Sequence, residues 1–262
     1  MSSEFLVAER QEGVCTITLN RPDRHNALCP ELLVELKQQL RSLAEGPGMH
    51  VVVLRGAGEK AFCSGYDLGS LPTSDSEPTL PPEEPVAEAM ESVKRYPYPV
   101  IAMIHGYAMG AGLGLATVCD LRIAADTGKF GMPPAKLGVV YAPSGLQDFL
   151  NVIGPANTRY MFLSARTVEA QEALHLGLVN QVVPAADLRD VVYGLANAIA
   201  AYAPLSLSGM KLILNRLVES SQLSPSEEEE FTALRVRAFN SQDRKEAMAA
   251  FQQRRTPKFL GE

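Results

Sequence analysis

The sequence predicts an α/β protein built around a parallel sheet, and three observations lead to this prediction. Over the first two thirds of the chain, short apolar runs alternate with stretches of helical apolar spacing, as in strands joined by crossover helices. Glycine-rich segments follow two of the apolar runs, where strand-to-helix turns are expected. Beyond residue 155 helical spacing dominates, so the chain is expected to end in a helical region.

The individual elements can be predicted in chain order. Residues 14–19 alternate as a strand does, and residues 30–44 place leucines at helical spacing after Pro30, which suits a first helical turn. The Pro-, Ser- and Glu-rich residues 71–85 predict a mobile loop. The other expected strands are 51–54, 99–104, 121–125, 129–131 and 178–183. The other expected helices are 86–95, 157–163, 168–174, 186–201, 204–220, 225–240 and 242–253.

Length and composition indicate a protein with a large core. With 262 residues, 46% of them hydrophobic, we expect a core domain over residues 1–200 and a helical carboxyl-terminal region over residues 201–262. A net charge of -6, a pI near 5.4 and scattered basic residues argue against nucleic-acid binding. The amino terminus lacks a signal-peptide pattern and no run approaches a membrane span, so we expect a cytoplasmic protein without a membrane partner.

The cysteines predict neither a metal site nor a disulfide framework. They are far apart in the sequence, lie mostly in apolar stretches and show no Cys-x-x-Cys spacing. The four are Cys15, Cys29, Cys63 and Cys119. We expect them to be reduced residues of the core.

Two glycine-containing turns form the strongest functional signal. Residues 106–114 read Gly-Tyr-Ala-Met-Gly-Ala-Gly-Leu-Gly after an apolar run, and residues 61–68 read Ala-Phe-Cys-Ser-Gly-Tyr-Asp-Leu after another. Such turns allow two main-chain N–H groups to point at one negatively charged oxygen. Neither segment fits a Walker phosphate loop or the dinucleotide pattern Gly-x-Gly-x-x-Gly. Tight helix packing is the alternative interpretation of an isolated glycine cluster.

Several motifs in the same order resemble the enoyl-CoA hydratase/isomerase, or crotonase, superfamily over nearly the whole chain. They are Asn20-Arg21-Pro22 with Asn26-Ala27-Leu28, the 61–68 segment, His105 through Gly114, Cys119-Asp120, Phe130-Gly131-Met132-Pro133 with Leu137-Gly138, and residues 170–179. The resemblance implies a spiral of strand-strand-helix repeats and a helical carboxyl-terminal trimerisation region. It also implies a homotrimer or a dimer of trimers, with a coenzyme A thioester as substrate and no other cofactor.

The resemblance also implies an oxyanion hole formed by the N–H groups of Tyr66 and Ala111. Attack at, proton removal from, or carbon dioxide loss beside a thioester places charge on its oxygen, which two such donors stabilise. The side chains and turns implied to border the coenzyme A are Arg24, Ala27, Ser64, Tyr66, Asp67, Leu68, Gly110, Lys211, Phe251 and Lys258. Solvated surface lysines are the alternative for Lys211 and Lys258, and His25 is a further candidate beside the nucleotide.

The chain departs from the family at both of its acid/base positions. Hydratases of this family carry two glutamates, and the matching positions here are Gly114 and Pro134. Neither side chain can transfer a proton, so the acid and the base that the two-carboxylate hydration mechanism requires are absent at these positions. An isomerase that relies on the second glutamate is disfavoured for the same reason.

Tyr66 and Tyr141 are the polar side chains that remain near the inferred oxygen site, and Tyr141 is the stronger catalytic candidate of the two. Leu-Gly-Val-x-Tyr at residues 137–141 resembles the methylmalonyl-CoA decarboxylase branch, which carries a histidine where this chain has Tyr66. Decarboxylation of a malonyl-type thioester needs no base, and a phenol donating to the departing carboxylate or to the enolate is sufficient. Alternatively, Tyr141 caps the core through a hydrogen bond to a carbonyl.

Three functions therefore remain open. The first is decarboxylation of a short malonyl-type acyl-CoA, and the second is a hydratase or isomerase that uses Tyr66, Tyr141 or a carboxylate of the 71–85 loop. The third is a coenzyme A-binding protein without catalysis. The remaining polar residues have simpler expected roles. For His105 the alternatives are contact with the ligand and a structural role, Asp67 is expected to cap a helix, and Asp120 is expected to hold a loop in place.

Overall fold

Two sheets form the framework of the protein. A computed structural model describes residues 5–46, 48–70, 83–137, 139–219 and 241–262, together with isolated positions between 226 and 237. The larger sheet has the strand order β1-β2-β3-β5-β7-β10, and all neighbouring pairs are parallel except β1 with β2. Its strands are β1 (Leu6–Gln11), β2 (Val14–Leu19), β3 (Val51–Gly56), β5 (Val100–Ile104), β7 (Leu121–Ala125) and β10 (Gln181–Val183). The predicted parallel α/β core is confirmed.

The smaller sheet was largely missed by the sequence interpretation. It has the order β4-β6-β8-β9, and its strands are β4 (Ala61–Cys63), β6 (Tyr107–Met109), β8 (Lys129–Gly131) and β9 (Thr167–Glu169). Of these four strands only β8 was predicted, and strands of three residues are in general too short to display a period of two. The expected helix 168–174 is wrong at its start. Val168 is buried and pairs with Phe130, and α5 (Ala170–His175) begins only after β9.

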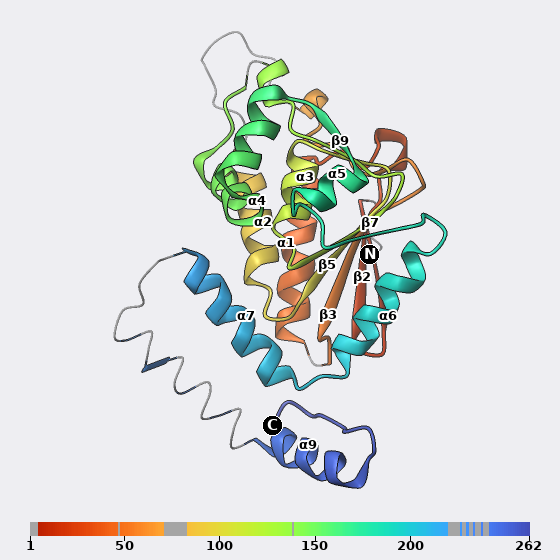
Figure 1. The fold of residues 1–262 in the computed structure, drawn as a ribbon, viewed down its shortest axis with the longest axis vertical. Coiled ribbons are helices and arrows are strands. Elements are labelled where there is room, and N and C mark those ends of the chain that lie inside the picture. The colour runs from red at the N-terminus through yellow and green to blue at the C-terminus, as the bar shows by residue number, and fades with distance from the viewer. Residues whose placement is uncertain are drawn as a thin grey trace.

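Helices cover both faces of the larger sheet (Figure 1). On one face α6 (Leu188–Ala200) contacts β2, β3, β5 and β7. On the other face lie α1 (Pro30–Glu45), α2 (Glu83–Arg95) and α3 (Ala111–Thr117). Alternate residues of β3 divide between the two faces, because Val52 and Leu54 join the core under α1 to α3 while Val51 and Val53 join the core under α6.

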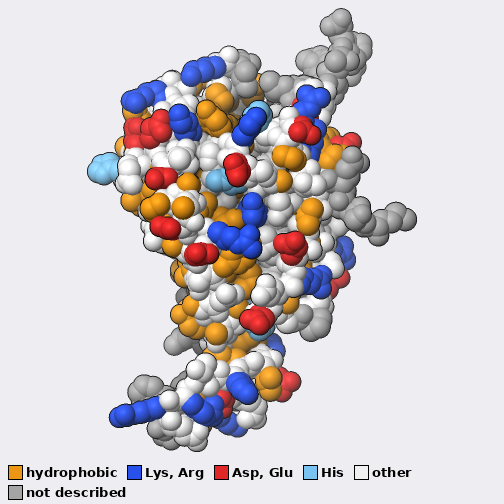
Figure 2. Space-filling view, turned by 90° about the vertical axis from the view of Figure 1, so that its right-hand side faces the viewer, with side chains coloured by type: hydrophobic (Ala, Val, Ile, Leu, Met, Phe, Trp, Pro, Cys, Tyr) orange, Lys and Arg blue, Asp and Glu red, His pale blue; other side chains and the backbone are white. Residues whose placement is uncertain are grey.

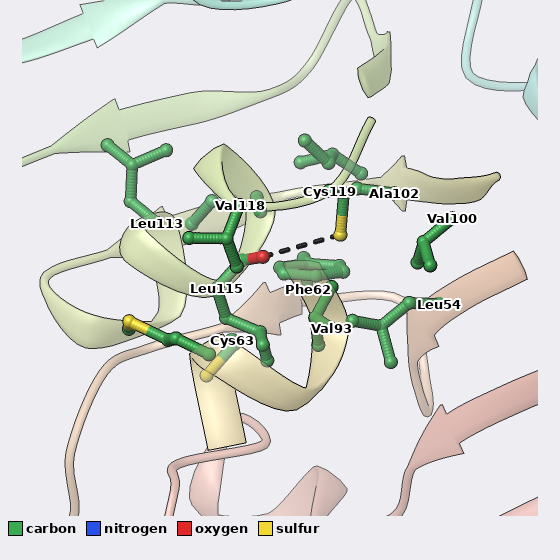
Figure 3. Packing of buried hydrophobic residues seen from close by; sticks show 14 of the residues in the cluster. Leu54, Phe62, Cys63, Val93, Val100, Ala102, Leu113, Leu115, Val118 and Cys119 are labelled. Carbon is green, nitrogen blue, oxygen red and sulfur yellow. Dashed lines mark hydrogen bonds between the residues drawn. The ribbon is translucent and has the colours of Figure 1, made fainter. Parts of the chain in front are cut away.

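The core beneath the helices positions the glycine-rich turns. Figure 3 shows Phe62 of β4 among side chains from β3, α2, β5 and α3, including Leu54, Val93 and Leu115. The Cys119 thiol donates a hydrogen bond to the Leu115 carbonyl in this cluster. The four cysteines are buried and free, as expected.

Helix α4 (Pro143–Ser164) is longer than the predicted helix 157–163. It bends at Gly154, where φ is 72° and ψ is 172°, just before Pro155. The sequence interpretation placed the change to helices at that proline and therefore missed the first half of α4, which carries Gly145 and Asp148.

The carboxyl-terminal helices extend away from the sheets. Figure 1 shows α7 (Pro204–Glu219) running beneath the core and α9 (Gln242–Gln253) beyond it. Both match the predicted helices. Most of the expected helix 225–240 and most of the expected loop 71–85 lie outside the described residues. Lys, Arg, Asp and Glu side chains are interspersed on the face in Figure 2, without a region of one sign.

In the described ranges no single helix is long and apolar enough to cross a membrane. Among the described helices, α6 and α7 pass that test by length and composition when taken as a pair, but the pair is bent by 106° at the break between them.

Candidate active site

A buried asparagine organises the loop that supports the first turn. Asn26 donates from Nδ2 to the carbonyls of Ala57 (2.9 Å) and Ala61 (2.7 Å). Arg21 donates to the Ala27 carbonyl (2.7 Å) and forms an ion pair with Asp67 (2.8 Å). The hydrogen bond from Arg21 lowers the pKa of Asp67. These bonds fix the polypeptide on both sides of Tyr66.

The N–H group of Tyr66 faces away from its bridging partner. Tyr66 forms an isolated parallel bridge with Leu28, in which the Leu28 N–H donates to the Gly65 carbonyl and the Asp67 N–H donates to the Leu28 carbonyl, both at 2.8 Å. Peptide groups alternate along an extended segment, so the N–H of Tyr66 points to the opposite side. Gly65 has a φ of +107°, which favours glycine at this turn.

The second turn lies against the first. Gly110 donates to the Gly131 carbonyl (2.9 Å), and Ala111 then begins α3, so its N–H has no acceptor within the helix. A Cβ atom on Gly65 would lie 3.7 Å from the Ala111 nitrogen, which places the two turns side by side. A Cβ atom on Gly112 would lie 2.6 Å from the Cys63 sulfur, so glycine is required for this close approach. The structure thus brings together the two predicted N–H donors.

The position of the first missing acid is filled by other side chains. A Cβ atom on Gly114 would lie 2.8 Å from the Tyr141 hydroxyl and 2.8 Å from Cε of Met90. The Tyr141 ring crosses α4 at Gly145, where a Cβ atom would lie 2.9 Å from Cδ1 of that ring. Gly114 and Gly145 therefore leave the space that the phenol occupies.

The Tyr141 ring is held by aromatic packing and stays protonated. It makes an edge contact with Phe162, with centroids 5.4 Å apart and planes at 63°. Burial, with a smaller contribution from the Asp148 carboxylate, raises the pKa of Tyr141 to about 12. No hydrogen bond links its hydroxyl to another residue in the described part of the chain. The alternative interpretation, a hydrogen bond from Tyr141 to a core carbonyl, is therefore wrong for these residues. The phenol is a proton donor across the neutral pH range.

The second missing acid is replaced by a structural proline. Pro134 is buried and begins a short 3-10 helix, Pro134–Leu137. Its carbonyl accepts a hydrogen bond from the Val139 N–H (3.0 Å). This position supplies a bend in the chain instead of a proton-transfer group.

The other sequence candidates near the two turns have definite partners. Asp67 accepts a hydrogen bond from the Gly69 N–H (3.1 Å), which is the predicted cap of the short helix Leu68–Ser70. Burial and the nearby Arg55 lower the pKa of His105, whose Nε2 has no partner among the described residues. The Tyr66 hydroxyl is also buried without a partner in those ranges.

Comparison with known proteins agrees with this geometry. Residues 9–262 match the sequence profile of the enoyl-CoA hydratase/isomerase family. The chain belongs to this family. It is an acyl-CoA enzyme of the crotonase superfamily, in which relatives are named as hydratases and as a decarboxylase.

Three similar proteins illustrate the range of this family. The 2,3-dehydroadipyl-CoA hydratase of Escherichia coli is 33% identical over 98% of each chain, and the methylmalonyl-CoA decarboxylase of Escherichia coli is 30% identical over the whole of both. A crystal structure of an enoyl-CoA hydratase/carnithine racemase from Magnetospirillum magneticum has a TM-score of 0.92 and 35% identity. It covers 100% of this chain and 97% of its own. The crotonase fold is thereby confirmed.

Several residues implied to border coenzyme A lie around the Tyr66 turn. Ser64 is exposed; its N–H donates to the His25 carbonyl (3.0 Å) and its hydroxyl to the Arg24 carbonyl (3.3 Å). Arg24 is exposed and Ala27 is buried beside it. The side chain of Leu68 lies outside the described part.

The carboxyl-terminal candidates Lys211 and Lys258 make no described contact with the two glycine-containing turns. Lys211 is 7% exposed and donates to Asp120 (2.6 Å) and to the Tyr98 carbonyl (3.0 Å), so the alternative of a solvated surface lysine is wrong. Asp120 also accepts from the Val100 N–H, as expected of a residue that pins a loop. Lys258 is exposed, and α9 lies far from α3 in Figure 1. The side chain of Phe251 is not described.

The sequence interpretation missed Met90, Gly145, Lys94 and Asp148. They lie on α2 and α4. Apolar periodicity alone does not indicate which residues of a helix contact a turn that is distant in the sequence. Within the described residues no group of three or more His, Cys, Asp or Glu side chains is arranged to hold a metal ion.

Proposed function

We propose that this enzyme decarboxylates a short malonyl-type acyl-CoA. The observation that carries the proposal is the replacement of the first acid by Gly114, with the hydroxyl of Tyr141 and the methyl group of Met90 in the adjoining space. A protonated phenol supports the loss of carbon dioxide and cannot act as the carboxylate base of a hydratase.

The reaction requires stabilisation of an enolate. The thioester oxygen accepts hydrogen bonds from the N–H groups of Tyr66 and Ala111, and each donor contributes roughly 3 kcal/mol to transition-state stabilisation. The bond between the α-carbon and the carboxylate breaks, and its electron pair forms the enolate. The Tyr141 hydroxyl donates to the departing carboxylate or to the enolate.

The remaining expectations accompany this proposal. Residues 1–200 form the acyl-CoA-binding core and residues 201–262 serve oligomerisation in a cytoplasmic homotrimer or dimer of trimers. Exposed apolar side chains on α7, among them Met210, Leu214 and Val218, support a contact with another copy of the chain. In such an assembly Lys258 and Phe251 of one copy are candidates to border the coenzyme A bound by another.

Hydration or isomerisation of an enoyl-CoA is the second candidate. Similarity to named hydratases supports it, including the relative at 33% identity. This reaction needs an unconventional acid or base, for which Tyr66 and Tyr141 are candidates because neither hydroxyl has a hydrogen-bond partner in the described ranges.

A substrate panel tests these functions. We expect carbon dioxide release from methylmalonyl-CoA or malonyl-CoA and its loss in Tyr141→Phe. Loss of crotonyl-CoA absorbance without carbon dioxide release would favour the second candidate. Binding of acetyl-CoA without turnover of any thioester would instead indicate a coenzyme A-binding protein.

A further inference from the structure

A cavity between α2 and α4 shares two of its lining residues, Met90 and Gly145, with the surroundings of Tyr141. Its volume is about 320 Å³, and it is lined by Ala87, Glu88, Met90, Glu91, Lys94, Ser144, Gly145 and Asp148. Two of these residues are already part of the site, since the methyl group of Met90 and the Tyr141 hydroxyl border the same point beside Gly114 and the Tyr141 ring lies on Gly145. The cavity therefore reaches the immediate surroundings of the phenol.

The exposure of the lining side chains indicates that the cavity opens to solvent. Glu88 and Glu91 are 53% and 37% exposed, whereas Asp148 is 16% exposed and Met90 is buried. The volume is sufficient for several water molecules, and polar partners are available to hold them. Water in the cavity can therefore connect bulk solvent with the wall formed by Met90 and Gly145, the two lining residues next to Tyr141.

Asp148 is the least exposed carboxylate of the lining. It lies one turn after Gly145 on the same face of α4, and its Oδ1 is 3.2 Å from Nζ of Lys94 on α2. Lys94 is also 3.2 Å from Glu91, which pairs in turn with Arg95, while Glu88 pairs with Lys37. The charge of Asp148 is thus balanced, and its second oxygen remains available to accept a hydrogen bond from water.

We infer that the α2–α4 cavity is the proton path of this enzyme and that Asp148 positions the water that reprotonates Tyr141. The inference rests on the proposed function, which leaves an enolate that needs a proton. The Tyr141 hydroxyl gives its proton to the α-carbon, and the enolate electron pair forms the new C–H bond. The phenolate takes a proton from a cavity water, and solvent replaces that proton. Asp148 is a positioning residue in this sequence of steps.

Exchange of α-protons in D2O tests the path without the decarboxylation step, because it runs the protonation of the enolate in both directions: the small phenolate fraction of Tyr141 removes the α-proton, and cavity water exchanges the phenol proton for deuterium. Wild-type enzyme is incubated with propionyl-CoA in D2O, and deuterium at the α-carbon is followed by mass spectrometry. We expect Asp148→Asn to slow exchange by about tenfold to a hundredfold, which is below most of the range for groups that transfer the proton themselves, because Asp148 acts only through water. Ala87→Leu, which narrows the cavity at its exposed rim, is expected to slow exchange without altering Asp148. Asp190→Asn on the exposed surface of α6 is the control and should leave the rate unchanged.

A second readout separates positioning from a structural role. In D2O the wild-type enzyme should place deuterium on one face of the α-carbon during decarboxylation of methylmalonyl-CoA, and Asp148→Asn should give a mixture of the two stereoisomers, which a loss of packing alone would not produce. Exchange in Asp148→Asn and Ala87→Leu equal to that of the control would overturn the inference while leaving the proposed function intact. If wild-type enzyme neither exchanges protons nor releases carbon dioxide, the proposed function fails and the inference fails with it.

Discussion

The Tyr141 hydroxyl lies 2.8 Å from the point where a Cβ atom of Gly114 would stand, although the two residues come from different segments of the chain. Gly114 is within α3 and Tyr141 precedes α4. Glycine inside a helix costs about 1 kcal/mol relative to alanine, so its presence here needs a packing reason. The phenol and the Met90 methyl group supply that reason.

Substitution Gly114→Ala should displace the phenol. We expect a loss of about 1 kcal/mol in the free energy of unfolding. The added methyl group overlaps Tyr141 and Met90, and the cost of this overlap exceeds the gain in helix propensity from alanine. Carbon dioxide release should fall by at least tenfold. Gly194→Ala on α6 is the matched control, since its Cβ meets nothing within 4 Å, and it should stabilise the protein by up to about 1 kcal/mol. Equal unfolding energies for the two variants would contradict this account.

Substitution Gly145→Ala should act through the same ring. A methyl group at this position would overlap Cε1 and Cδ1 of the Tyr141 ring, which is rigid and held by Phe162, so we expect a loss of about 2 kcal/mol in unfolding free energy. Near-ultraviolet circular dichroism should report the altered tyrosine, and activity should fall to the level of Tyr141→Phe. Gln147→Ala on the exposed side of α4 is the control. An unaltered aromatic spectrum in Gly145→Ala would refute the expected displacement.

The pH dependence of stability should reveal the raised pKa of the half-buried Tyr141 phenol. The folded-state pKa of Tyr141 is raised to about 12 from an ordinary value of 10, so the neutral form is favoured by folding. Its contribution is fully present below pH 10 and is lost as the pH rises through 12. Urea unfolding of wild type and Tyr141→Phe should therefore differ by an amount that changes by about 2 to 3 kcal/mol between these limits. A difference independent of pH would show that the phenol is not buried.

Lys211 should contribute to stability and not to coenzyme A affinity. Lys211→Met leaves Asp120 without its ion-pair partner beside Val100 and Tyr98, and we expect a loss of about 3 kcal/mol in unfolding free energy. The KM for the acyl-CoA should remain unchanged under conditions where the variant is folded. Lys258→Met, at an exposed position, should leave stability within 0.5 kcal/mol of wild type. A raised KM with unchanged stability in Lys211→Met would restore the phosphate-binding role.

The sequence was most informative where a local pattern has a local cause. Residues 14–19 and 242–253 were predicted with their observed bounds, because periodicity reports which face of an element is buried. The turns around Tyr66 and Ala111 were recognisable because glycines and their order leave a contiguous signature. The strands Ala61–Cys63 and Tyr107–Met109 left none, since three residues cannot show a period.

The sequence by itself determined the family, the two turns and the absence of acids at Gly114 and Pro134. Only the tertiary structure decided what takes the place of the first acid, that Lys211 is buried against Asp120, and that Lys94 and Asp148 share a cavity with Met90. The physical reason is that residue type and spacing specify the conformation of a segment. Which atoms fill the space beside it depends on the packing of segments distant in the chain.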